Sequence, residues 1–242
     1  MLRGLRGLLR PTPERPITHR LRRLTNRLWL GTLGSTRPIS DAWGFDRGTP
    51  VDRVYIEEFL AQHRDAIRGR VVEIQDRLYT QRFGSGVTSS DVLDIDAANV
   101  RATIVADLAR ADHVPSDRYD CLIVTQTLHL IRDTRSAVAH LHRMLAPGGV
   151  LLATLPSVSR VSGGVGVAGD YWRFTVASAR WLFGDVFGEE AVSVASRGNV
   201  LSAIAFLKGL AAEELSASSI AVDDPFFPVV ITVRAVKRAA GA

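Results

Sequence analysis

The 242-residue sequence has a single cysteine, Cys121, and its six histidines form no cluster with it. One thiol cannot make an internal disulfide, and no cysteine or histidine group has zinc spacing, so disulfide scaffolds and zinc domains are both excluded. We therefore expect a reducing, cytoplasmic compartment. No apolar run reaches the ~18 residues needed to cross a bilayer, and the N-terminus lacks the apolar core of a signal peptide.

Acidic residues are almost missing from positions 1–37, which hold nine arginines and one acid, Glu14. This arm therefore carries +8, whereas the whole chain carries +5, so residues 38–242 carry −3. Because the basic character belongs to the arm, we expect no nucleic-acid binding by the body. Residues 17–33 predict a basic amphipathic helix. Such a helix either caps its own domain or contacts an anionic membrane or a partner enzyme.

With 46% apolar and 23% charged residues, the body suits one α/β domain. In it, residues 38–69 predict a loop and a helix, and residues 70–242 predict the core. Apolar runs cover 70–74, 86–90, 102–106, 119–125, 148–155, 191–196 and 228–236, and helical patterns cover 133–146, 175–187 and 199–215. The alternation predicts a Rossmann-like, seven-stranded, mostly parallel sheet with helices on both faces, preceded by an N-terminal helical extension.

The region before the core combines a loop with helix signals. Residues 43–48 form an aromatic and charged loop, which is a candidate lid. Thr49 is the expected N-cap of the following helix, Pro50 its first residue and Asp52 the partner in a capping-box-like pattern. Gly69 is expected to end this helix.

Acidic residues stand at the ends of three predicted strands: Glu73, Asp91 and Asp107. The carboxyl ends of parallel strands meet at one edge of the sheet, where open α/β sheets bind their ligands. Three carboxylates suit a ligand with ribose hydroxyls, an exocyclic amine and an ammonium group, which are all hydrogen-bond donors. They suit a dinucleotide less well, because a pyrophosphate needs backbone N–H groups. Each acid can equally be a helix cap or a solvated loop residue.

Several segments, taken in order, resemble the class I S-adenosylmethionine-dependent methyltransferases. They are the strand at 70–74, V-A-D-L (105–108), S-D-R-Y-D-C-L-I-V-T-Q-T-L (116–128), L-A-P-G-G (145–149) and G-D-Y-W-R-F-T (169–175). The last segment is typical of a subgroup of bacterial small-molecule and saccharide methyltransferases. The resemblance implies the class I fold and S-adenosylmethionine as the cofactor.

The resemblance also implies roles for matching positions. Glu73 would lie near the methionine part of the cofactor, and Asp91 would hold the ribose hydroxyls. The short crossover after the first strand favours Asp91 over its rivals Asp94 and Asp96. The further residues implied to contact the cofactor are Asp107 and Leu108 beside adenine, Gln126 near the methyl group, and Gln75, Asp76, Tyr79 and Arg47.

Glycine is missing directly after the first strand, where members of the family usually place it. Gln75 occupies that position, and the next glycine is Gly84. Glycine is preferred there because it adopts positive φ and lets the backbone approach the ligand. Two interpretations stay open. Either the loop is re-routed, with Tyr79 and Gly84 making the turn, or the site is vestigial. The intact acids favour the first.

Methyl transfer to oxygen is an in-line displacement that requires alignment of the acceptor and removal of a proton. His129 and Asp170 are the candidate catalytic bases, and His129 is equally compatible with a place in the core. Gly169 stands where related sequences often carry histidine, which favours His129. The expected acceptor-binding residues are Tyr55, Tyr171, Trp172 and Arg173. Trp172 and Phe174 can instead anchor the next helix.

The sequence therefore predicts an S-adenosylmethionine-dependent O-methyltransferase that acts on a hydroxyl of a sugar or glycosylated natural product. The alternative is a catalytically degenerate methyltransferase-like protein serving as a partner-binding or auxiliary subunit, or a non-methylating enzyme on this fold. Expected partners are a small-molecule or saccharide acceptor and, in a homodimer, a second copy of the chain. No residue cluster demands a metal ion. A nicotinamide-dependent oxidoreductase is disfavoured because its glycine fingerprint is missing.

Overall fold

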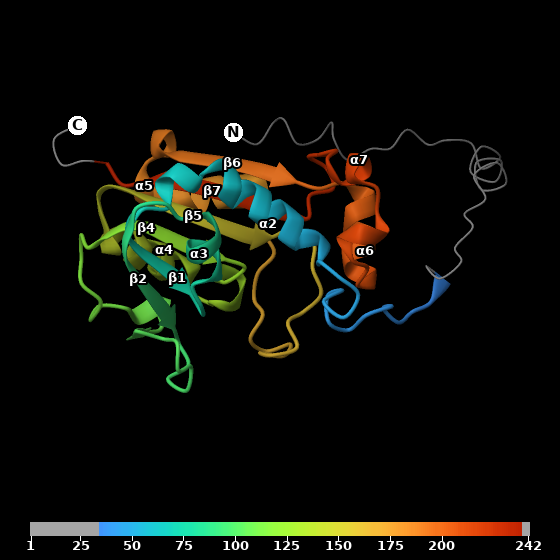
Figure 1. Ribbon diagram of the computed structural model, residues 1–242, viewed down its shortest axis with the longest axis horizontal. Helices are drawn as coiled ribbons and strands as arrows, with labels where there is room; N and C mark the ends of the chain where they lie inside the picture. Colours follow the sequence, from blue (N-terminus) through green and yellow to red (C-terminus); the bar gives the residue numbers. More distant parts are fainter. Residues whose placement is uncertain (1–33, 239–242) are drawn as a thin grey trace, which may run out of the picture. The chain divides into compact units, whose positions relative to one another are not determined.

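The computed structural model describes residues 34–238, and from Pro38 the chain forms one compact unit. The amphipathic helix expected at 17–33 lies outside the described residues. A seven-stranded sheet runs through the unit in the order β3-β2-β1-β4-β5-β7-β6 (Figure 1). Its strands are β1 (Gly69–Ile74), β2 (Val87–Asp94), β3 (Ile104–Val105), β4 (Tyr119–Thr125), β5 (Leu145–Pro156), β6 (Val192–Arg197) and β7 (Val230–Val236).

The strand order places a switch point in the middle of the sheet. β1 pairs in parallel with β2 on one side and with β4 on the other, and β2–β3 and β4–β5 are also parallel. β7 pairs antiparallel with both β5 and β6. The prediction of a seven-stranded, mostly parallel sheet is confirmed. The carboxyl ends of β1 to β4 meet at one edge, beside the β1–β4 switch point, where ligand sites form in such sheets.

Helices cover both faces of the sheet, as predicted. Helices α4 (Thr134–Met144) and α5 (Val176–Phe187) pack on one face. Helices α2 (Val51–Gln62), α3 (Leu78–Phe83) and α6 (Val200–Lys208) pack on the other. The short helix α7 (Ala217–Ile220) precedes β7. This two-faced core is the reason why the strands read as almost continuous apolar runs.

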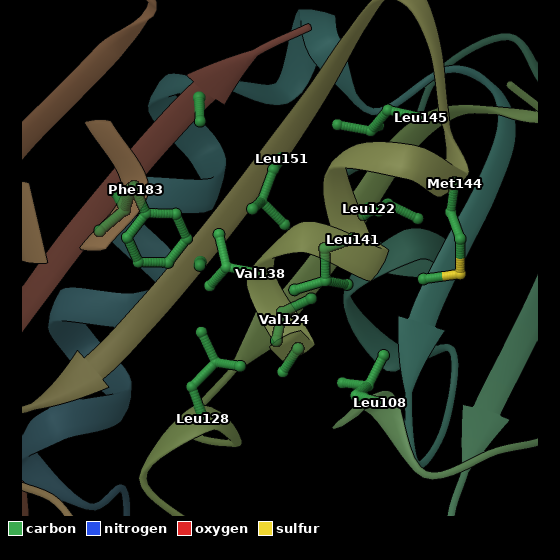
Figure 2. Packing of buried hydrophobic residues seen from close by; sticks show 14 of the residues in the cluster. Leu108, Leu122, Val124, Leu128, Val138, Leu141, Met144, Leu145, Leu151 and Phe183 are labelled. Atoms are coloured by element: carbon green, nitrogen blue, oxygen red, sulfur yellow. The ribbon is translucent and has the colours of Figure 1, made fainter. Parts of the chain in front are cut away.

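Alternate residues of the central strands supply the two core clusters. On β4, Leu122 and Val124 join the cluster beneath α4 and α5, while Cys121 and Ile123 join the opposite one. Figure 2 shows Leu122 and Val124 beside Leu141 of α4. Burying a side chain of this size contributes roughly 1.5–3 kcal/mol. The Cys121 thiol is fully buried, and burial raises its pKa to about 12.

Three predicted N-caps are confirmed by side-chain hydrogen bonds. Asp133 accepts from the backbone N–H of Ser136 at the start of α4. Thr175 and Asn199 cap α5 and α6, each in a capping box. The predicted end of the last helix is wrong. α6 ends at Lys208, because Gly209 has φ +72° and closes the helix in the left-handed conformation, whereas the helical pattern continued to 215.

The boundaries predicted for the helix before the sheet are also wrong. Thr49 does not cap α2, because its hydroxyl donates a hydrogen bond to Oε1 of Glu213 (2.7 Å), and Pro50 is the N-cap. The helix stops at Gln62 and a 3₁₀ turn follows, so Gly69 begins β1 and does not end the helix. None of the helices in the described part of the chain combines the length and apolarity needed to cross a bilayer.

Candidate functional site

The carboxyl ends of β1 to β4 open into a cleft of about 760 Å³. This volume lies within the ~300–1,000 Å³ typical of small-molecule sites. The opposite wall comes from the segment before the sheet and includes Phe45, Thr49 and Arg53. Val165, from the long loop after β5, also borders the cleft. The cleft therefore lies where the sequence predicts a ligand site.

Glu73, at the end of β1, lines the cleft and is only 2% exposed. Its Oε1 accepts from the backbone N–H of Tyr79 (3.0 Å), and its Oε2 accepts from both the N–H and the hydroxyl of Thr80 (2.7 and 2.8 Å). Burial raises the pKa of this carboxyl, and the three donors act against that rise. Glu73 thus ties β1 to the start of α3. Its contact with the cofactor stays a prediction.

The missing glycine does not prevent the usual turn. Gln75 has φ +72°, the left-handed conformation that favours glycine. Its N–H donates to the carbonyl of Leu93 (3.0 Å), and its carbonyl accepts from Nδ2 of Asn99 (2.8 Å). The prediction of a turn re-routed through Tyr79 and Gly84 is therefore wrong. Tyr79 lies in α3, and Gly84 follows that helix with an ordinary φ of −69°.

The position predicted for Asp91 is wrong, because β2 continues to Asp94. Asp91 lies within the strand, opposite Val72 of β1. Its carboxylate accepts from the hydroxyls of Thr103 (2.8 Å) and Tyr119 (3.2 Å), and it does not line the cleft.

Asp94 is the acid that reaches the cleft at the end of β2. Its Oδ2 accepts from Nδ2 of Asn99 (2.7 Å), and its Oδ1 accepts from the N–H of Asp96 (3.0 Å). Asp96 is exposed and lies outside the cleft lining. The apolar pair Val92–Leu93 is the sequence signal for this strand end. The polar run before it concealed that signal.

Asp107, Leu108 and Gln126 line the cleft, and their contacts with the cofactor stay predictions. Oδ1 of Asp107 accepts from the N–H of Ala109 (2.9 Å) and caps a 3₁₀ turn, while Leu108 is buried beneath it. Gln126 follows β4 with φ +47°, and its N–H donates to the carbonyl of Thr154 on β5 (2.9 Å). Asp76 and Tyr79 also line the cleft.

Two residues predicted to close over the ligand lie elsewhere. Nε of Arg47 donates to Oε2 of Glu214 (2.9 Å), and the arginine does not line the cleft. Tyr55 is fully buried and its hydroxyl donates to the carbonyl of Ile220 (3.1 Å), so the prediction that it binds the acceptor is wrong. Arg53 was not among the predicted site residues, but it lines the cleft and its Nη1 donates to the hydroxyl of Tyr79 (2.8 Å). The feature of the sequence that could have indicated Arg53 is its place in the first turn of the helix before β1.

Neither candidate base lines the cleft. His129 is 9% exposed, lies outside the cleft lining, and has its pKa lowered to about 4, chiefly by burial. The side chain of Asp170 has no exposed surface and forms an ion pair with Arg173 (2.5 and 3.0 Å). The hydrogen bond from Arg173 is the main reason why the pKa of Asp170 is lowered. A buried, paired carboxylate of this kind is a poor base.

The aromatic segment after Asp170 is anchored through its backbone. The N–H groups of Tyr171 and Trp172 donate to the carbonyl of His129, and Nε1 of Trp172 donates to the carbonyl of Ile131 (2.9 Å). The side chains of Tyr171 and Trp172 remain 47% and 42% exposed. Arg173 is engaged by Asp170, so it is not the free charge expected for acceptor binding.

No group of three or more histidine, cysteine or acidic side chains within residues 34–238 is arranged to hold a metal ion. The lining residues instead bring carboxylates and amides to the ends of three parallel strands. This arrangement defines a nucleotide-binding type of cleft on a Rossmann-like sheet.

Comparison with known proteins identifies a methyltransferase domain in part of the chain. Residues 78–153 match the model of a methyltransferase domain. No curated protein sequence matches the chain significantly. Residues 78–153 therefore belong to a methyltransferase domain, and the sheet has the strand order of the class I S-adenosylmethionine-dependent methyltransferase fold, as the resemblance implied.

Three solved structures share the fold, each with a TM-score of 0.50. A methyltransferase from Archaeoglobus fulgidus is 10% identical, covering 76% of this chain and 94% of its own. The N-methyltransferase NodS from Bradyrhizobium japonicum, solved with S-adenosyl-L-homocysteine, is 13% identical, and the match covers 79% of this chain and 89% of NodS. The [4+2]-cyclase SpnF is 15% identical, and the match covers 92% of this chain and 96% of SpnF.

Proposed function

We propose that this methyltransferase binds its cofactor across the ends of β1, β2 and β3 and methylates a hydroxyl of a sugar or sugar-bearing small molecule. The observation that carries the cofactor position is the alignment of Glu73, Asp94 and Asp107 along one cleft. When bound, S-adenosylmethionine supplies an activated methyl group on a sulfonium. The chain's own task is to hold this group in line with the acceptor.

The donor and acceptor chemistry of the cleft fits the nucleoside. Among the described residues, each carboxylate oxygen of Asp94 accepts one side-chain or backbone hydrogen bond, and each can accept a second from a ribose hydroxyl. Oδ2 of Asp107 has no donor among the described residues and can accept from the adenine amine. Ile95 and Leu108 supply apolar surface for the base. Gln126, at the end of β4, lies on the side proposed for the methyl group.

The support for a sugar-bearing acceptor is the pair of exposed aromatic side chains, Tyr171 and Trp172. Trp172 is held by the carbonyl of Ile131, which itself lines the cleft. Amphipathic aromatic rings of this kind present an apolar face and a polar edge to a ligand. Because His129 and Asp170 do not reach the cleft, the proposal rests on alignment of the acceptor and includes no role for them as bases.

The second candidate is a degenerate or non-methylating protein on this fold. It is favoured by Gln75 in place of glycine and by the engagement of both Glu73 oxygens within the chain. The fold itself is also shared with a protein described as a cyclase.

Calorimetry with S-adenosylmethionine and S-adenosylhomocysteine separates the two candidates. We expect binding of both, followed by transfer of labelled methyl to glycosides but not to their matched aglycones. Absence of binding at millimolar ligand would overturn the proposed cofactor site. Binding of the cofactor without transfer to any hydroxyl would favour the degenerate protein, and transfer to the aglycone would contradict the sugar acceptor.

We also propose that residues 1–37 form a separate arm that contacts an anionic membrane or a partner enzyme, while residues 38–242 form the catalytic domain. The support is the charge of the arm, nine arginines against one acid. Deletion of residues 1–35 should abolish co-sedimentation with anionic liposomes or co-purification of a partner. Unchanged behaviour of the truncated chain in both assays would contradict this role. Size-exclusion chromatography with light scattering tests the expected homodimer.

A further inference from the structure

Carboxylates dominate the charge of the cleft. Its lining includes Glu57, Glu73, Asp76, Asp94 and Asp107. Arg53 is the single basic side chain among the described lining residues. The proposed cofactor carries a carboxylate in addition to its sulfonium and ammonium groups, and the surrounding acids would repel that carboxylate. A cationic side chain on one side of the cleft would offset this repulsion.

The backbone donors nearest this position are already used. The N–H of Leu78 donates to Oδ1 of Asp76 (2.9 Å), and the N–H groups of Tyr79 and Thr80 donate to Glu73. The first turn of α3 therefore has these three N–H groups occupied by the chain's own carboxylates. Recognition of a ligand carboxylate here must come from side chains.

Arg53 and Tyr79 form a fixed pair at the cleft wall. Nη1 of Arg53 donates to the hydroxyl of Tyr79 (2.8 Å), and the Arg53 guanidinium lies 5.9 Å from the ring centre of Phe45. Tyr79 is 5% exposed, and its ring stacks on Phe83 with 6.2 Å between centroids. Burial raises the pKa of the Tyr79 hydroxyl, so it keeps its proton and can donate it while accepting from Arg53.

The acids closest to Arg53 leave it available. Glu57 accepts a hydrogen bond from Nη1 of Arg82, on α3. Asp52 is buried, burial raises the pKa of its carboxyl while the neighbouring Arg53 acts against that rise, and the Asp52 carboxyl accepts no hydrogen bond from the Arg53 guanidinium. Within residues 34–238, the side chain of Arg53 makes one hydrogen bond, to the hydroxyl of Tyr79. Its remaining N–H groups can therefore bind a ligand.

We propose that Arg53 and Tyr79 together bind the α-carboxylate of the cofactor, through the guanidinium and the phenolic O–H. This inference rests on the proposed function. Two side chains would then bind the ligand carboxylate, because the backbone N–H groups in the first turn of α3 already donate to Asp76 and Glu73. Charge-assisted bonds of this kind are the stronger class of hydrogen bond.

The test compares S-adenosylhomocysteine with S-adenosyl-3-thiopropylamine, which lacks only the carboxylate. Calorimetry with the full chain should show that the wild type binds S-adenosylhomocysteine at least about tenfold more tightly. Arg53→Gln should lower the affinity for S-adenosylhomocysteine about 10- to 100-fold and change the affinity for the amine by less than about twofold. Tyr79→Phe should lower the affinity for S-adenosylhomocysteine about three- to tenfold and leave the affinity for the amine nearly unchanged.

Arg68→Gln is the matched control, because Arg68 is exposed, lies outside the cleft lining and carries the same charge. It should change neither affinity. Equal affinity of the wild type for the two ligands would overturn the inference without any variant, and so would equal weakening of both ligands by Arg53→Gln. Absence of binding of both ligands to the wild type would overturn the proposed function and this inference with it.

Discussion

The side-chain amide of Asn99 donates a hydrogen bond of 2.7 Å to Oδ2 of Asp94. The same Nδ2 donates to the carbonyl of Gln75 at 2.8 Å. One side chain therefore connects the end of β2 with the left-handed turn that follows β1. It orients the carboxylate proposed for the ribose and the backbone of the turn that has no glycine.

Replacing Asn99 with alanine should therefore affect both features. We expect the free energy of unfolding to fall by about 1 kcal/mol, since a net hydrogen bond contributes roughly that amount. We also expect S-adenosylhomocysteine to bind about tenfold more weakly, because Asp94 loses its orientation. Urea unfolding and calorimetry measure the two effects. Asp96→Asn, at a neighbouring position outside the cleft lining, is the control, and unchanged affinity in Asn99→Ala would contradict the account.

Gln75→Gly should stabilise the protein. A side chain in the left-handed region costs roughly 1–2 kcal/mol, part of which glycine recovers against its greater freedom in the unfolded chain. We expect a gain of about 0.5–1 kcal/mol, with cofactor binding retained. Gln81→Gly makes the same exchange within α3 and should lower the free energy of unfolding by about 1 kcal/mol. Destabilisation by both variants would show that Gln75 is not held in the left-handed conformation.

His129 should make stability depend on pH. Its pKa is about 4 in the folded protein and about 6.5 in the unfolded chain, so the unfolded state binds more protons between these values. The contribution of His129 is complete above about pH 6.5 and is lost as pH falls towards 4. It amounts to at most about 3 kcal/mol.

Urea unfolding of His129→Asn across pH 4–7 measures this contribution. The variant should lose the part of the pH dependence that His129 causes, whereas His113→Asn, at an exposed position, should keep the dependence of the wild type. Identical pH profiles for His129→Asn and the wild type would contradict the burial of His129. An activity profile that follows the titration of His129 would restore it as a candidate base.

The sequence predicts the sheet well because strands buried on two faces read as apolar runs, and because Asp133, Thr175 and Asn199 cap their helices through local hydrogen bonds. It misplaces Asp91 because β2 begins with a polar stretch, so the strand end at Asp94 depends on pairing with β1. The surroundings of the two candidate bases could not be predicted for a different reason. Whether Asp170 faces solvent or Arg173 is decided by loop packing, which has no periodic signal in the sequence.

Acids at the strand ends are proposed to hold the nucleoside, and a comparison of Asp94→Asn with Asp91→Asn is the sharpest test of this proposal. Both substitutions remove one charge from the same strand, but only Asp94 lines the cleft. Calorimetric titration with S-adenosylhomocysteine should show affinity reduced about 10- to 100-fold in Asp94→Asn and unchanged within about twofold in Asp91→Asn. Loss of binding in Asp91→Asn with normal binding in Asp94→Asn would contradict the claim.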